Sequence, residues 1–138
     1  METSTLPEFN DILALLPEKK RAFARVLTNL SESDNFDDYR LAANTYRTKG
    51  EFEIAAACYR AAIRRFPDSA VAYRELGAIQ ELLEDFDGEI ESYRQALCLS
   101  PEHPFWLYGT LARLLSGQPS QESKAEAIEI YKQGIKVD

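Results

Sequence analysis

Three polar residues near the middle of the chain have a spacing that suits the recognition of a negatively charged group. Arg40 and Arg47 are seven residues apart, which is two turns of an α-helix, and Asn44 lies between them. In a helix, all three side chains share one face. The planar guanidinium of arginine binds carboxylates and phosphates through parallel hydrogen bonds, and an asparagine amide can hydrogen-bond a peptide backbone. The spacing therefore predicts a binding face.

Other residue types that often carry chemistry occur in patterns that fit no catalytic or metal site. His103 is the single histidine, and one histidine cannot form a His-rich metal site. The stretch 85–88 (DFDG) resembles part of a calcium loop, but the first and last ligand positions would be Leu83 and Arg94. Neither a glycine-rich phosphate loop nor a nucleophile with its base stands out. We therefore predict no catalytic residue, no metal and no cofactor.

The elements that must position these residues follow from a period of 34 residues. The recurring pairs are Tyr39 and Tyr73, Phe52 and Phe86, Tyr59 and Tyr93, Ala62 and Ala96, and Pro67 and Pro101. A fixed period of this length is typical of stacked helical units that bury their apolar faces against one another. No segment alternates with period two, so the expected fold is all-α.

Apolar spacing, glycines and prolines indicate where the helices begin and end. The units are expected to contain helices over about 37–49 and 53–66, then 70–84 and 88–99, then 105–115 and 123–136. Gly50 and Asp85 mark the first two turns, and the third turn, at 117–120, is longer. Before these units, residues 7–30 are expected to form a pair of short helices divided by Pro17.

The composition favours some functional classes over others. The chain has 138 residues, 45% of them hydrophobic, and a net charge of −7. It therefore has enough apolar residues for one folded core, and its acidity disfavours nucleic acid and anionic membranes as partners. Cys58 and Cys98 lie on separate expected helices, so we expect two reduced thiols that act as small core residues. The N-terminus (METSTLPEF) lacks the pattern of a secretory signal, and the expected location is cytoplasmic.

The repeated unit resembles the tetratricopeptide repeat, whose signature is W-x₂-L-G-x₂-Y…A-x₃-F…P. The first unit matches at Tyr39, Ala42, Ala43, Tyr46, Gly50, Ala55, Tyr59, Ala62 and Pro67, and the second at Tyr73, Leu76, Gly77, Tyr93, Ala96 and Pro101. A third unit matches more weakly, at Tyr108, Leu111, Ala112, Leu115, Ala127, Tyr131 and Gly134. The resemblance implies an α-α superhelix of hairpins over 36–138, with repeats of about 36–69, 70–103 and 104–138 after an N-terminal segment 1–35. Gln80 replaces an expected aromatic residue and Glu89 an expected small one, which predicts looser packing there.

In this family the first helix of each hairpin lines a concave groove that typically holds an extended peptide or another protein's helix. By this resemblance the groove residues are Arg40, Asn44, Arg47, Arg74, Glu81, Trp106 and Arg113. Four arginines imply a preference for an acidic ligand; the alternative is that they pair with neighbouring acids on a solvated face. Arg40 and Asn44 also resemble part of the clamp with which some members hold chaperone tails, but Glu75 stands where an asparagine is expected, so the clamp is incomplete.

The resulting hypothesis is a non-enzymatic module that binds a peptide or protein segment in its groove. Two alternatives remain open. The first alternative is the accessory N-terminal region of a larger enzyme. The chain ends near a repeat boundary, and residues 104–108 (PFWLY) resemble repeats that are joined to bacterial glycosyl-, sulfo- or methyltransferases. The apolar last helix, with Ala127, Ile128, Ile130, Tyr131 and Ile135, also favours a self-associating scaffold or homodimer.

Overall fold

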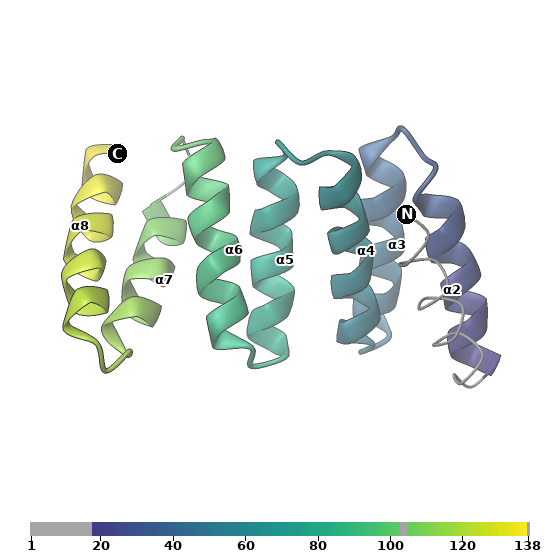
Figure 1. The fold of residues 1–138 in the computed structure, drawn as a ribbon, viewed down its shortest axis with the longest axis horizontal. Helices are drawn as coiled ribbons and strands as arrows, with labels where there is room; N and C mark the ends of the chain where they lie inside the picture. The colour runs from purple at the N-terminus through teal and green to yellow at the C-terminus, as the bar shows by residue number, and fades with distance from the viewer. Residues whose placement is uncertain (1–17, 103–104, 138) are drawn as a thin grey trace, which may run out of the picture.

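The computed structural model describes residues 18–102 and 105–137, and these ranges contain seven α-helices and no strand. The helices are α2 (Glu18–Leu30), α3 (Phe36–Thr48), α4 (Phe52–Arg65), α5 (Ala70–Leu82), α6 (Phe86–Leu99), α7 (Phe105–Ser116) and α8 (Gln121–Val137). They stand side by side in one row (Figure 1), with α3–α4, α5–α6 and α7–α8 as successive hairpins. The predicted all-α stack is therefore confirmed. Of the expected N-terminal pair, α2 is present, and the first member lies outside the described residues.

Side-chain caps determine where several of these helices begin. Asn35 and Ser69 precede α3 and α5, and each side chain accepts a hydrogen bond from a backbone N–H of the first turn, at 3.0 and 3.1 Å. Asp85 caps α6 in the same way, at 3.1 Å, and Ser120 caps α8. Because the helix begins directly after its cap, α6 and α8 each start two residues earlier than the apolar spacing predicts.

The turns inside the first two hairpins share a left-handed backbone residue at equivalent positions. Gly50 has φ of +80° after α3, and Glu84 has φ of +58° after α5. The two positions are one repeat apart in the sequence. Glycine adopts this conformation without a steric cost, whereas a residue with a Cβ is strained there. The second hairpin therefore has the same turn geometry as the first, with a less suitable residue.

The core lies between the hairpin helices and combines leucine and isoleucine side chains with small residues packed against tyrosine rings. Tyr39 and Tyr59 belong to a cluster that joins α2, α3, α4 and α5, and Tyr93 and Tyr108 belong to a second cluster that joins α6, α7 and α8. Tyr93 lies so close to Gly77 that an added Cβ would be 2.5 Å from the ring. The aromatic side chains of the repeat therefore fit closely against its small residues.

The two departures from the repeat pattern are both buried in the contact between α5 and α6. Gln80 accepts a hydrogen bond from Ser92 Oγ at 2.6 Å, and an added Cβ at Gly88 would lie 2.6 Å from the Gln80 amide. Glu89 is completely buried and its carboxylate has no hydrogen-bond partner among the described residues. Both polar side chains are therefore enclosed in this contact, and the looser packing expected there stays a prediction.

The two cysteines differ in their surroundings, which corrects the expectation that both are core residues. Cys58 is buried and Cys98 is exposed, and both are free thiols. Helix α6 turns Ala96 and Leu97 toward the core, so the next residue along the helix points outward.

Among the described residues, no helix combines the length and apolar character that crossing a membrane requires.

Candidate functional site

A hollow on one face of the first two hairpins brings together the three residues singled out by their spacing. It has a volume of about 620 Å³ and is lined by Asp37, Arg40, Leu41, Asn44, Arg47, Tyr59 and Glu75. The side chains come from α3, with one residue each from α4 and α5. We call this hollow the α3 groove. The predicted face of Arg40, Asn44 and Arg47 therefore exists as one surface.

Ion pairs within the chain already occupy some of the arginines near the α3 groove. The Arg40 guanidinium lies 2.9 Å from the Asp37 carboxylate, one helical turn earlier. Arg74 lies 3.4 Å from Glu75. Arg47 is exposed and forms no ion pair in the part of the chain that the structure describes. The alternative that arginines pair with neighbouring acids is thus found for Arg40 and Arg74, and Arg47 is left as the cation available to a ligand.

The floor of the α3 groove contains a polar atom without a partner. The Tyr59 side chain is 1% exposed, and its hydroxyl has no hydrogen-bond partner within the described ranges. The pKa of Tyr59 is raised to about 12, chiefly by burial and also by the Glu75 charge, while the Arg40 and Arg47 charges act in the opposite direction. The hydroxyl is therefore protonated at neutral pH and is positioned to act as a donor beside the charged rim.

The other predicted groove residues do not line this hollow. Trp106 is half exposed and packs edge-on against Tyr93, with ring centroids 6.5 Å apart. Arg113 lines a separate hollow of about 410 Å³ between α7 and α8, together with apolar side chains that include Ile128 and Tyr131. Arg74 and Glu81 line neither hollow. Of the predicted groove residues, Arg40, Asn44 and Arg47 therefore share one hollow, and the other four lie elsewhere.

Glu89 is an ionisable group that the sequence analysis treats only as a packing fault. Its pKa is raised to about 7, chiefly by burial and also by the charges of Glu81 and Asp85, while the Arg113 charge opposes them. Glu81 and Arg113 are both residues that the sequence analysis expects in the groove, and their charges act on Glu89 in opposite directions. The signal in the sequence is an acidic residue at a position where the repeat requires a small one.

Sequence reasoning also missed Leu41 as a groove residue. Leu41 is 70% exposed and lies in the α3 groove beside Arg40. It is one residue along from Arg40 and three before Asn44, so helical spacing alone places it at the same face. An exposed leucine among charged side chains adds an apolar contact to an otherwise polar surface.

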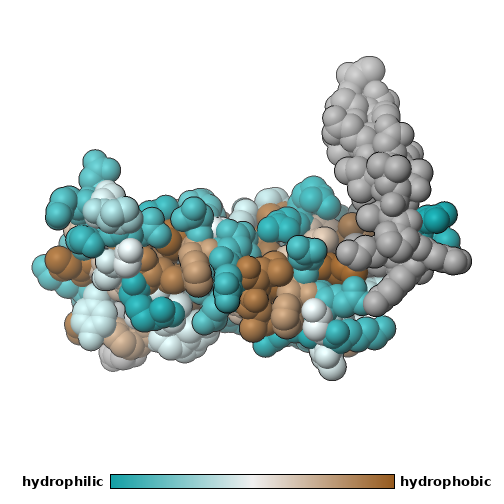
Figure 2. All heavy atoms as spheres, turned by 90° about the horizontal axis from the view of Figure 1, so that it is seen from below, coloured by the Kyte–Doolittle hydropathy of each residue, from teal (hydrophilic) through white to brown (hydrophobic). Residues whose placement is uncertain are grey.

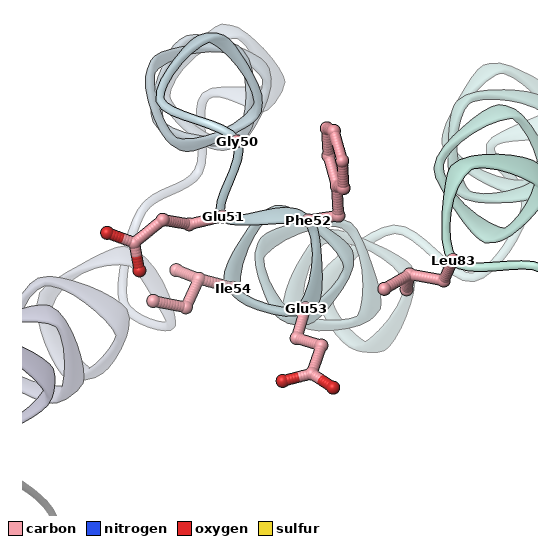
Figure 3. Close-up of a pocket in the computed structure, with 6 residues that line it drawn as sticks. All are labelled: Gly50, Glu51, Phe52, Glu53, Ile54 and Leu83. Carbon is pink, nitrogen blue, oxygen red and sulfur yellow. The ribbon is translucent and has the colours of Figure 1, made fainter.

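A third hollow, of about 280 Å³, lies at the turns between α3 and α4 and at the end of α5. Its lining is Gly50, Glu51, Phe52, Glu53, Ile54 and Leu83. Figure 3 shows that these side chains diverge: Phe52 points to one side of α4 and Glu53 to the opposite side. Because polar and apolar groups do not converge on a common point, this hollow lacks the arrangement of a ligand site.

The outer face of α8 exposes apolar side chains at the end of the row. Ile128, Tyr131 and Ile135 are 59%, 49% and 55% exposed, whereas Ala127 is buried and Ile130 packs against the second core cluster. In the view from below, apolar surface interrupts hydrophilic surface at this end (Figure 2). The predicted apolar set is therefore divided between the core and an uncovered face. No group of three or more metal-ligating side chains occurs among the residues described.

Comparisons with known proteins agree with this architecture. The tetratricopeptide repeat family model matches residues 40–104. An auxiliary subunit of the N-terminal acetyltransferase A complex of Arabidopsis thaliana is 31% identical over 94 residues, which is 67% of this chain and 10% of that protein. Small glutamine-rich tetratricopeptide repeat-containing protein 2 of Saccharomyces cerevisiae is 24% identical over 98% of this chain and 37% of its own length. The chain thus spans a tenth and little more than a third of these two relatives.

Solved structures with the same fold include MamA and a yeast protein. A MamA crystal structure aligns with a TM-score of 0.64 and 20% identity over 99% of this chain and 72% of that chain. The TPR2B domain of yeast Sti1, in a complex with pHsp70, aligns with a TM-score of 0.53 and 20% identity over 77% of this chain and all of that domain. At such identities the likeness shows the fold. The period, the matched stretch and the row of hairpins show that the chain belongs to the tetratricopeptide repeat family.

Proposed function

We propose that this chain is a protein-interaction module that binds a peptide or protein segment in the α3 groove. The observation that carries the proposal is the convergence of Arg40, Asn44 and Arg47 on one hollow of about 620 Å³. A hollow of this size with a few convergent polar groups has the character of a ligand site. The complex of the Sti1 TPR2B domain with pHsp70 supports an interaction role for the fold.

The charge of the α3 groove favours a ligand with a negative group. Asp37 neutralises Arg40, and Arg74 neutralises Glu75, so the charge that remains is that of Arg47. A ligand carboxylate at Arg47 gains a charge-assisted hydrogen bond. Leu41 adds apolar contact, and the charge sets the orientation of the ligand and its rate of association.

The proposal includes a role without catalysis and a location in the cytoplasm. Tetratricopeptide repeat proteins are generally non-catalytic scaffolds, and the α3 groove contains no pairing of a nucleophile with a base. Cys58 and Cys98 are both free thiols, one of them exposed, and this condition suits a reducing compartment.

A peptide selection tests the proposal directly. Peptides are selected on the chain from a random displayed library, and the dissociation constant of the best one is measured by calorimetry. We expect the double variant Arg40→Ala, Arg47→Ala to lose roughly 10- to 100-fold in affinity, since charged hydrogen bonds contribute about 1.5–3 kcal/mol. The matched control is Arg60→Ala, Arg64→Ala, which removes two exposed arginines of α4 outside the hollow. Equal affinity of the groove variant and the control would refute the α3 groove as the site.

Self-association through α8 is a second candidate function. The observation in its favour is the uncovered face of Ile128, Tyr131 and Ile135 beside the hollow between α7 and α8. Stacks of repeats require a polar surface at their ends for solubility.

A further inference from the structure

We propose that the hydroxyl of Tyr59 is a specificity determinant of the α3 groove, where it donates a hydrogen bond to a carboxylate side chain of the bound peptide. This inference rests on the proposed function and names the ligand group that the hollow accepts. It also assigns a binding role to a tyrosine that the repeat pattern explains as a core residue.

The first observation is the unsatisfied state of the hydroxyl. Tyr59 is 1% exposed, and its oxygen is buried without a hydrogen-bond partner in the described part of the chain. Buried polar groups in folded proteins almost always have a partner, because an unpaired one has lost its hydrogen bond to water. A buried hydroxyl in the lining of a hollow is therefore a site at which a ligand atom can replace the missing partner.

The second observation is the arrangement of charges around that hydroxyl. Its pKa responds to Glu75, Arg40 and Arg47, all of which line the same hollow. Tyr59 itself is one of the residues that line this hollow, and its hydroxyl remains a donor at neutral pH. Arg74 holds Glu75 in an ion pair, while Arg47 has no such partner among the described residues. One ligand carboxylate can therefore accept from Tyr59 with one oxygen and from Arg47 with the other.

Most of the side chains that line the α3 groove are exposed. The groove is lined by Arg40, Leu41 and Arg47, all of them exposed. Exposed side chains change rotamer on a picosecond-to-nanosecond scale. We therefore expect the peptide carboxylate to reach the hydroxyl by displacing side chains of the α3 groove.

The equivalent tyrosine of the second unit provides a matched control. Tyr93 is one repeat after Tyr59 and is equally buried. Its ring packs on Gly77 and against the edge of Trp106, and it lines neither the α3 groove nor the other two hollows. Tyr59→Phe and Tyr93→Phe therefore remove the same atom from similar cores, and only the first removes it from the groove.

The experiment uses the library-selected peptide in two forms: the original, and versions with each Asp or Glu replaced in turn by Asn or Gln. Dissociation constants are measured for the wild-type chain, Tyr59→Phe, Tyr93→Phe and Arg47→Ala. We expect Tyr59→Phe to lose about 10-fold in affinity for the acidic peptide, and to lose most of the wild type's preference for one acidic residue over its amide. Tyr93→Phe should bind within about 2-fold of wild type.

Each outcome decides a different question. If Tyr59→Phe binds and discriminates as the wild type does while Arg47→Ala binds weakly, the inference about Tyr59 is overturned and the groove remains the site. If Arg47→Ala and Tyr59→Phe both bind as the wild type does, the inference about Tyr59 and the proposed function of the α3 groove are both refuted. Thermal melting is the folding control. Because the hydroxyl has no partner, Tyr59→Phe should melt at or above the wild-type temperature. A lower melting temperature would contradict the unsatisfied state on which the inference depends.

Discussion

At the residue scale, the contact between α5 and α6 contains two buried polar residues with different hydrogen bonding. Gln80 accepts from Ser92 Oγ at 2.6 Å, so replacing an aromatic residue with glutamine leaves its side-chain oxygen satisfied. Glu89 has no partner for either carboxylate oxygen among the described residues. Burying an unpaired carboxylate in its charged form is unfavourable, so Glu89 is a position at which pH acts on the fold.

We predict that the stability of the chain falls as pH rises, because of Glu89. Its pKa is raised in the folded state from 4.5 to about 7, so the folded chain binds the proton more tightly than the unfolded chain does. The stabilising effect is fully present below pH 4.5 and is lost as pH rises toward 7, with a magnitude of up to ~3 kcal/mol. Urea unfolding across this pH range measures the effect.

The matched variants for this prediction are Glu89→Gln and Glu91→Gln on the same helix. Glu89→Gln removes the titrating group and should flatten the profile between about pH 4.5 and 7. Glu91 is exposed, so its variant should retain the wild-type profile. A wild-type profile in Glu89→Gln would show that another group is responsible.

At the element scale, the hairpin turns determine how each pair of helices meets. Gly50 and Glu84 occupy equivalent positions with positive φ, and only glycine adopts this conformation without strain. An added Cβ at Gly50 would have no atom within 4 Å. A substitution at Gly50 therefore tests the backbone conformation alone, because the new side chain would meet no neighbouring atom.

We predict opposite effects of substitution at the two turns. Glu84→Gly should stabilise the chain by about 1 kcal/mol, because it removes the left-handed strain, and Gly50→Ala should destabilise it by a similar amount. Chemical denaturation with each variant measures both free energies of unfolding. If Glu84→Gly is no more stable than wild type, the strain at that turn is negligible.

At the scale of the whole molecule, the two ends of the stack are different surfaces. Helix α2 packs against α4 at one end, whereas α8 at the other end exposes the face of Ile128, Tyr131 and Ile135. Within the stack, each hairpin covers the apolar face of its neighbour. Among the described residues, no further hairpin covers the outer face of α8, so this face is the surface at which association is favoured.

We predict that residues 1–138 associate through α8 at high concentration. Sedimentation velocity from about 10 μM to 1 mM should show a shift toward a dimer, since apolar surface is removed from water on association. The double variant Ile128→Lys, Ile135→Lys should stay monomeric across the same range. Leu82→Lys, which alters an exposed leucine of α5, is the control and should behave as wild type. A wild-type chain that is monomeric at 1 mM would contradict the prediction.

The sequence by itself determined the features that depend on local pattern. The 34-residue period predicted the number and type of the helices after residue 36, and the spacing of Arg40, Asn44 and Arg47 predicted their common face. Helical periodicity requires only neighbours along the chain, so a single sequence contains this information. The boundaries of the repeats as domains, and the ligand itself, stay predictions.

Only the tertiary structure decided which atoms have partners. Arg94 and Glu126 are 32 residues apart and are joined by two hydrogen bonds of 2.6 and 2.8 Å. Within the described ranges, Glu89 is buried without a partner and the hydroxyl of Tyr59, which lines the α3 groove, is unpaired. These outcomes depend on the distance and angle between helices, which are set by packing across the whole stack. Local pattern identified the face on which a ligand is proposed to bind, and packing between helices determined which groups on that face are free to hold it.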